Sequence, residues 1–97
     1  MSTSKQRRIV VEERGEVLIT EGVRATMSAD EIDTALERHC AGDWGDLGAE
    51  EKASNDRALE TGCGALVSRY CALCGLAFFV LTEGDRSVTT VFLPLEY

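Results

Sequence analysis

The sequence contains no long hydrophobic run, and this absence excludes a membrane-spanning helix. Its longest uninterrupted apolar segment is the six residues Leu76–Leu81, whereas a helix that crosses a bilayer needs about 20. The N-terminus is charged, but Glu12 and Glu13 interrupt the apolar residues that follow it, so a secretory signal is not expected. We therefore expect a cytoplasmic protein that does not contact a membrane.

Motifs of the common catalytic sites are also missing. The sequence has one histidine, His39, and it has neither a G-x-S-x-G motif nor a glycine-rich phosphate-binding loop. A general base needs a nucleophile or an acid held beside it, and no motif supplies one for His39. His39 is therefore expected to be a helix-end residue, and the protein is expected not to be an enzyme. A hydrolase or transferase that uses Asp85, Arg86 and His39 is the weaker alternative.

Negative charge is present in excess, and it is concentrated in one part of the chain. The 97 residues carry a net charge of −7. Residues 28–60 contain ten acidic and three basic residues, which is −7, whereas residues 1–27 and 61–97 carry +1 and −1. Such a field repels nucleic-acid phosphates and attracts basic surfaces. It favours a protein partner with a basic surface over direct nucleic-acid binding. The alternative is a solvated face that only maintains solubility.

Length and composition predict a single globular domain. With 44% hydrophobic and 28% charged residues, residues 1–97 are expected to form one domain with a modest core, and residues 1–7 a flexible arm. The next segment has a β-like composition, because Ile9–Val11 and Val17–Ile19 are β-branched or apolar runs. These runs predict one strand, or a hairpin that turns at Arg14-Gly15.

Two helices are expected in the acidic middle segment. Ser28 and Glu31 form a capping box, in which each side chain accepts a hydrogen bond from the other residue's backbone N–H. Apolar residues then recur at helical spacing until Gly42 ends the helix; they are Ile32, Ala35, Leu36 and Cys40. A second, short helix with a narrow apolar side is expected from about Ala49 to Leu59, before Gly62.

The hydrophobic period changes to two after residue 64, which indicates strands. We expect strands at residues 65–72, 75–83 and 87–93, and Pro94 marks the end of the last one because it cannot donate a ladder hydrogen bond. The whole pattern predicts an α+β fold with the order β(β)ααβββ. Its sheet is expected to be antiparallel, with three to five strands and two helices on one face, and to be closed by Tyr97.

The most specific candidate for a chemical site is the C-x-x-C-G turn at Cys71–Gly75. Such a turn at a hairpin tip directs two thiolates, from Cys71 and Cys74, at one point, as in a zinc knuckle. Cys63 and Cys40 are candidates for the remaining ligands, with His39 as the alternative to its neighbour Cys40. A second C-x-x-C pair is missing, so the cysteines are otherwise interpreted as small buried or turn residues. No cofactor other than zinc is expected.

The loop between the two helices carries candidate binding residues. Asp43 and Asp46 flank Trp44, and Glu50 and Glu51 follow in the next helix. Trp44 is expected to anchor the loop on the sheet, and if exposed it is the strongest hot-spot candidate in the chain.

A second loop places Asp85 and Arg86 in the turn before the last strand. Asp85 is expected to bond the turn backbone, and Arg86 to pair with a nearby acid. Both residues are also candidates for contact with a partner.

Three stretches of the chain contain sequence motifs that occur together in a family of proteins: Arg38–Gly45, Lys52–Leu59 and Thr82–Tyr97. They read as an H-x-x-G-D-W-G loop, an N-D-x-A-L helix and a T-E-x-D-R-S-x-T-T-x-x-L-P-x-E-Y ending. In these motifs the chain resembles a family of small, uncharacterised bacterial proteins that are common on plasmids, prophages and other mobile elements. The resemblance covers roughly residues 30–97. It breaks at Cys71–Gly75, where relatives usually have a short polar or glycine turn.

The resemblance implies an accessory protein of a mobile element and no particular activity. Together with the acidic segment, it favours a non-enzymatic protein of a phage or plasmid that binds another macromolecule. The most concrete form is an inhibitor of a host nuclease defence, such as an anti-CRISPR or anti-restriction protein, with a homodimer as one arrangement. The alternative is a small zinc-stabilised module that uses Cys71 and Cys74.

Overall fold

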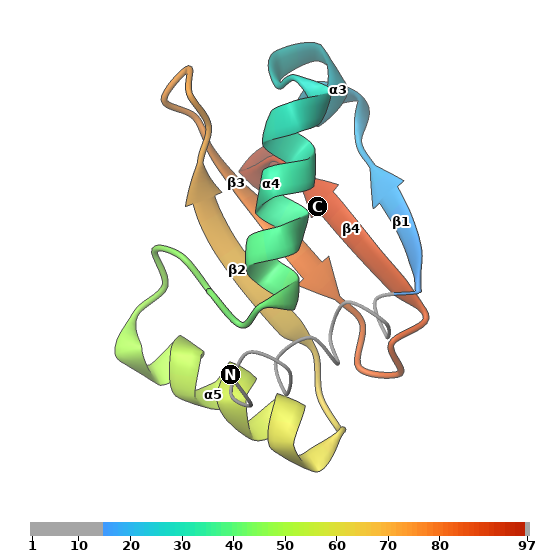
Figure 1. Cartoon of the computed structure of the whole chain (residues 1–97), viewed down its shortest axis with the longest axis vertical. Coiled ribbons are helices and arrows are strands. Elements are labelled where there is room, and N and C mark those ends of the chain that lie inside the picture. The colour runs from blue at the N-terminus through green and yellow to red at the C-terminus, as the bar shows by residue number, and fades with distance from the viewer. Residues whose placement is uncertain (1–14, 97) are drawn as a thin grey trace.

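The computed structural model describes residues 15–96, in which four strands form one sheet beside three α-helices (Figure 1). Along the chain, the elements are β1 (Glu16–Ile19), α3 (Glu21–Thr26), α4 (Ala29–Cys40), α5 (Ala49–Thr61), β2 (Leu66–Cys71), β3 (Ala77–Thr82), β4 (Val88–Phe92) and a 3-10 helix (Pro94–Glu96). The strands lie side by side in the order β1-β4-β3-β2. The predicted α+β class is confirmed, and the last three strands occur where the alternating pattern places them.

The sheet is mixed, so the prediction of an antiparallel sheet is wrong for one strand. β2 pairs antiparallel with β3, and β3 with β4, but β1 runs parallel to β4, with Glu16 opposite Val88 and Ile19 opposite Val91. Between β1 and β4 the chain passes through three helices and two strands, so no tight turn sets their relative direction. The local pattern of β1 therefore contains no information about its partner.

Several expected features lie outside the described residues. These are the arm at residues 1–7, the strand at Ile9–Val11, the Arg14 half of the hairpin turn and the closing residue Tyr97.

The short helix α3 is not anticipated from the sequence. Thr20 caps it, since its hydroxyl accepts a hydrogen bond from the Val23 N–H at 3.4 Å, and the Met27 N–H donates to the Val23 carbonyl at 2.8 Å where it ends. Its six residues make fewer than two turns, too few for an apolar stripe to be recognised. The helix contributes the buried side chain of Val23 to the core, and the residue that follows its last turn, Met27, contributes another.

Helix α4 begins at the predicted capping box. The Glu31 N–H donates to the Ser28 hydroxyl at 3.2 Å, and the Ser28 N–H donates to a Glu31 carboxylate oxygen at 3.2 Å. The helix crosses one face of the sheet (Figure 1). Its buried stripe consists of Ile32, Ala35, Leu36, His39 and Cys40. The stripe includes every apolar residue expected for it and adds His39.

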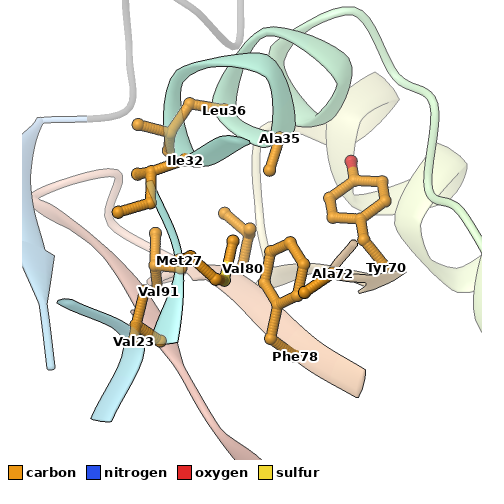
Figure 2. Packing of buried hydrophobic residues seen from close by; sticks show 10 residues of the cluster. All are labelled: Val23, Met27, Ile32, Ala35, Leu36, Tyr70, Ala72, Phe78, Val80 and Val91. Atoms are coloured by element: carbon orange, nitrogen blue, oxygen red, sulfur yellow. The ribbon is translucent and has the colours of Figure 1, made fainter. Parts of the chain in front are cut away.

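The main core lies between α4 and the sheet. Figure 2 shows Ile32, Ala35 and Leu36 of α4 above Val80 of β3 and Val91 of β4. The same cluster contains Val23, Met27, Tyr70, Ala72 and Phe78. A fully buried aliphatic side chain contributes about 1.5–3 kcal/mol, so this contact fixes α4 on the sheet.

Helix α5 packs through a much narrower side, as its sequence predicts. Only Asn55 and Ala58 are buried in it, and Ala58 joins a second cluster with Cys40, Trp44 and Leu66. Gly62, with φ of 76°, ends the helix in the left-handed conformation. Among the helices of residues 15–96, none is long and apolar enough to cross a membrane.

Candidate protein-binding surface

The outer edge of β2 is closed by residues of the loop and of α5. The Asn55 side chain donates to the Val67 carbonyl at 2.6 Å and accepts from the Val67 N–H at 3.1 Å. Two residues further along, the Arg69 N–H donates to the Trp44 carbonyl at 3.1 Å, and the Asp46 N–H donates to the Arg69 carbonyl at 2.8 Å. An open strand edge is a template for unwanted pairing. Asn55 and the loop thus protect the sheet.

Trp44 is buried, with 4% of its surface exposed. Its indole N–H donates to an Asp56 carboxylate oxygen at 3.0 Å, and its ring meets the His39 ring edge to face with centroids 5.7 Å apart. The expectation that Trp44 anchors the loop on the sheet is confirmed. The alternative of an exposed hot spot is wrong, because the ring is buried in the second core cluster.

Asp43 is held by its neighbours in the loop. One carboxylate oxygen accepts from Arg38 Nε at 2.7 Å and the other from the Gly45 N–H at 3.2 Å, while the Tyr70 hydroxyl donates to the Asp43 carbonyl at 2.6 Å. The hydrogen bond from Arg38 lowers the pKa of the Asp43 carboxyl below its usual value. The Arg38 guanidinium in turn lies 4.5 Å above the Tyr70 ring. The charge of Asp43 is therefore largely offset by Arg38.

Asp85 and Arg86 fasten the turn between β3 and β4. Asp85 accepts hydrogen bonds from the N–H and hydroxyl of Ser87, at 3.0 and 2.6 Å, and these bonds lower the pKa of its carboxyl. Arg86 donates to the carbonyl oxygens of Gly64 at 2.7 Å and Ala58 at 3.1 Å. The expected bond of Asp85 to the turn backbone is confirmed. Arg86 binds carbonyl groups at the C-terminal end of α5, where a cation is also favoured by the helix dipole.

The predicted binding residues do not converge on one point. Asp46, Glu50 and Glu51 lie near the start of α5, whereas Asp85 and Arg86 adjoin its last turn. A helix of 13 residues is about 19 Å long, so α5 separates the two groups.

His39 is the centre of a buried polar chain that the sequence analysis misses. Its ring nitrogens lie 2.6 Å from the Ser68 hydroxyl and 2.9 Å from the Thr82 hydroxyl, and Thr82 lies 2.8 Å from the Thr89 hydroxyl. All four side chains are 0% exposed. Burial lowers the pKa of His39 to about 4, so the ring is neutral at pH 7. The sequence signal that could have revealed the burial of His39 is its helical spacing from Ala35 and Leu36, which places it on the buried stripe of α4.

The four cysteines are not assembled into a site within one chain. Cys40 is buried beside Trp44, whereas Cys63, Cys71 and Cys74 are exposed thiols. Within residues 15–96, no three residues of the types His, Cys, Asp and Glu are grouped to hold a metal ion.

The acidic side chains outside these contacts form a solvent-exposed surface. We call acidic surface the exposed carboxylates of α4, the loop and α5 that these contacts do not engage: Asp30, Asp33, Glu37, Asp46, Glu50, Glu51 and Glu60. On α4 the residues Asp30, Asp33 and Glu37 are spaced by three and four positions, so they share the side that faces away from the sheet. Lys52 and Arg57 are the exposed basic residues of α5.

Comparison of the chain with protein-family models, with curated proteins and with solved structures finds no match. The resemblance to a mobile-element family thus stays a prediction.

The motif residues that carry this resemblance make contacts within the fold. In the C-terminal motif, Glu96 accepts hydrogen bonds from the Thr20 hydroxyl and from the N–H groups of Gly22 and Leu93, which ties the chain end to α3. Asn55 in the helix motif and Trp44 in the loop motif form hydrogen bonds with the backbone at the outer edge of β2. These motif residues therefore have structural roles, and the acidic surface lies mostly outside the motifs.

Proposed function

We propose that this protein is not an enzyme and that it binds a basic surface of another protein through its acidic surface. The observation that carries the proposal is the position of the charge. The whole net charge of −7 falls within residues 28–60, and nine of the ten acidic residues of that segment, all except Glu31, are exposed on α4, the loop and α5. Concentrated charge of one sign steers a partner of opposite sign and repels phosphates.

The most concrete form of this function is inhibition of a host nuclease defence by a phage or plasmid protein, as an anti-CRISPR or anti-restriction protein does. A nuclease holds its substrate in a basic groove, where its lysines and arginines neutralise phosphates. Carboxylates presented by a folded protein compete for the same cations. The resemblance to mobile-element proteins supports this choice of partner.

The side chains most suited to the contact are those on α4. Asp33 and Glu37 are exposed, and no hydrogen bond or ion pair engages them among the described residues. Asp43, which the sequence singles out, is less suited because Arg38 already pairs with it. Reversing Asp43 would also break the bond that holds the loop.

A capture experiment with charge variants tests the proposal. The full chain, the variant Asp33→Lys/Glu37→Lys and the control Glu16→Lys/Glu21→Lys are immobilised and exposed to a bacterial lysate at about 50 mM salt. The two variants change the net charge equally, and all four positions are exposed. We expect a basic nucleic-acid-binding protein on the wild type and the control but not on the α4 variant. Equal recovery on all three baits, or recovery on none, contradicts the proposal.

A zinc-stabilised interaction module is the second candidate. The observation that favours it is the exposure of both Cys71 and Cys74 at the turn between β2 and β3.

A further inference from the structure

The turn between β2 and β3 is unusual for an exposed part of an acidic protein. We call hairpin tip the residues Cys71, Leu73, Cys74 and Leu76. Leu73 is 91% and Leu76 48% exposed, and both thiols are exposed as well. From Tyr70 to Thr82 the chain has no charged residue. Figure 1 shows this turn projecting at one end of the sheet.

The backbone of the tip is well defined. The Ala72 N–H donates to the Leu76 carbonyl at 2.8 Å, and the Gly75 N–H donates to the Ala72 carbonyl at 2.9 Å. Gly75 has φ of 96°, which a residue with a side chain rarely adopts. The Leu73 N–H is held by a Glu31 carboxylate oxygen at 2.8 Å. Cys71 ends β2 and Cys74 lies inside this turn, so the two thiols sit on a fixed frame with the C-x-x-C spacing of zinc ligands.

Within residues 15–96, no third residue of the types His, Cys, Asp and Glu is grouped with these two thiols. Cys63 precedes β2 whereas Cys71 ends it, and a six-residue strand is about 17 Å long. Cys40 is buried, and both ring nitrogens of His39 are engaged by Ser68 and Thr82. Residues 1–14 and 97 contain neither cysteine nor histidine. A structural zinc ion takes four ligands, so a second molecule must provide the other two.

We propose that two copies of this chain share one zinc ion, held by Cys71 and Cys74 of each copy in a tetrahedral site. Zn²⁺ displaces one proton from each of the four thiols, so the step releases four protons and leaves a complex with a charge of −2. The exposed Arg69 precedes Cys71 by two residues, and alternate residues of a strand share a face, so it contributes a positive charge nearby.

The second copy is favoured as the partner for two reasons. A two-fold axis through the metal places thiols against thiols and leucines against leucines, which is the self-complementarity that a symmetric dimer needs. The tip itself also carries no charged side chain, so two tips can meet without placing like charges of their own directly opposite each other. A contact limited to two tips is far smaller than the roughly 800 Å² per partner of a stable interface. The dimer therefore depends on the metal.

Titration with zinc chloride tests this proposal independently of the acidic surface. The untagged full chain, freed of metal and kept reduced, is followed by native mass spectrometry and by light scattering after gel filtration. We expect a monomer without zinc and, with zinc, a dimer that contains one ion per two chains. Cys71→Ser and Cys74→Ser are each expected to abolish both metal uptake and dimer. The matched control Cys63→Ser, also at an exposed thiol, is expected to retain both.

Other outcomes overturn the proposal. One zinc ion per monomer means that a single chain completes the site, and no uptake at micromolar zinc means that the tip is not a metal site. A dimer that persists with a chelator or in Cys71→Ser uses another surface. Because the substituted thiols are exposed, circular dichroism of each variant is expected to match the wild type, and Co²⁺ absorption in the wild type reports tetrahedral thiolate coordination directly.

Discussion

Lowering the pH below about 6.5 is expected to destabilise the fold through His39. The ring is fully buried between Ser68 and Thr82, and burial lowers its pKa to about 4 from the ordinary value of 6.5. Between these two pH values the unfolded chain binds a proton that the folded chain excludes. The free energy of unfolding therefore falls as the pH falls through this window, and it is fully retained above it.

The size of the effect follows from the two pKa values. The difference between 6.5 and about 4 corresponds to roughly 3 kcal/mol in total, of which about 2 kcal/mol is lost between pH 7 and pH 5. Carboxylates titrate mostly below pH 5, so they contribute little to this interval. The total stability of a small domain is about 5–15 kcal/mol, so the loss is large enough to measure.

Urea denaturation at pH 7 and pH 5 measures this loss. Trp44 is the only tryptophan and is buried against the His39 ring, so its fluorescence reports unfolding. The variant His39→Gln, which can keep one hydrogen bond but cannot take up a proton, is expected to lose most of the difference between the two pH values. Equal stability of the wild type at both values refutes the reasoning. If His39→Gln does not fold, NMR titration of the single histidine in the wild type tests the same reasoning: a ring with a pKa of about 4 stays mostly neutral at pH 5, so its signals should move only slightly between pH 7 and pH 5.

Two further substitutions test the edge of β2. Asn55→Ala leaves the N–H and the carbonyl of Val67 without their side-chain partner and is expected to cost about 2 kcal/mol by urea denaturation; Ser54→Ala, at the exposed neighbouring position, should cost less than about 0.5 kcal/mol. Gly45→Ala and Gly62→Ala both change a glycine at positive φ, but a Cβ at Gly45 overlaps the backbone of β2 whereas one at Gly62 meets nothing within 4 Å. Gly62→Ala is expected to lower the free energy of unfolding by about 1 kcal/mol, and Gly45→Ala to lower it clearly more. Equal urea midpoints of the two variants would show that the loop does not approach β2 this closely.

Elements with a local signal were predictable from the sequence. The capping box of Ser28 and Glu31 fixes the start of α4, because both of its hydrogen bonds join residues three apart. The alternation after residue 64 places three strands, since a sheet with one face on a core requires a period of two. The prediction that Trp44 anchors its loop was also correct, because the indole ring packs in the second core cluster.

Features that depend on distant contacts were not predictable. The parallel pairing of β1 with β4 joins residues about 70 positions apart, such as Glu16 and Val88, and nothing near Glu16 encodes it. The sequence predicts His39 only as a helix-end residue, because its partners in the buried polar chain, Ser68 and Thr82, lie in two later strands. The candidate site also differs from the predicted one. Only the fold shows that Asp43 is paired with Arg38, and this pairing makes the exposed carboxylates of α4 better suited to bind a partner than Asp43.

The direct test of the central claim is the association rate of this protein with its captured partner as a function of salt. Attraction between an acidic surface and a basic one is screened as the Debye length falls from about 14 Å at 50 mM to a few Å at 500 mM salt. We expect the association rate constant to fall at least tenfold over this range, and Asp33→Lys/Glu37→Lys to lower it at 50 mM salt while Glu16→Lys/Glu21→Lys has a smaller effect. A rate that does not depend on salt, and that both double variants share with the wild type, contradicts the account and leaves the charge of residues 28–60 as a solubility feature.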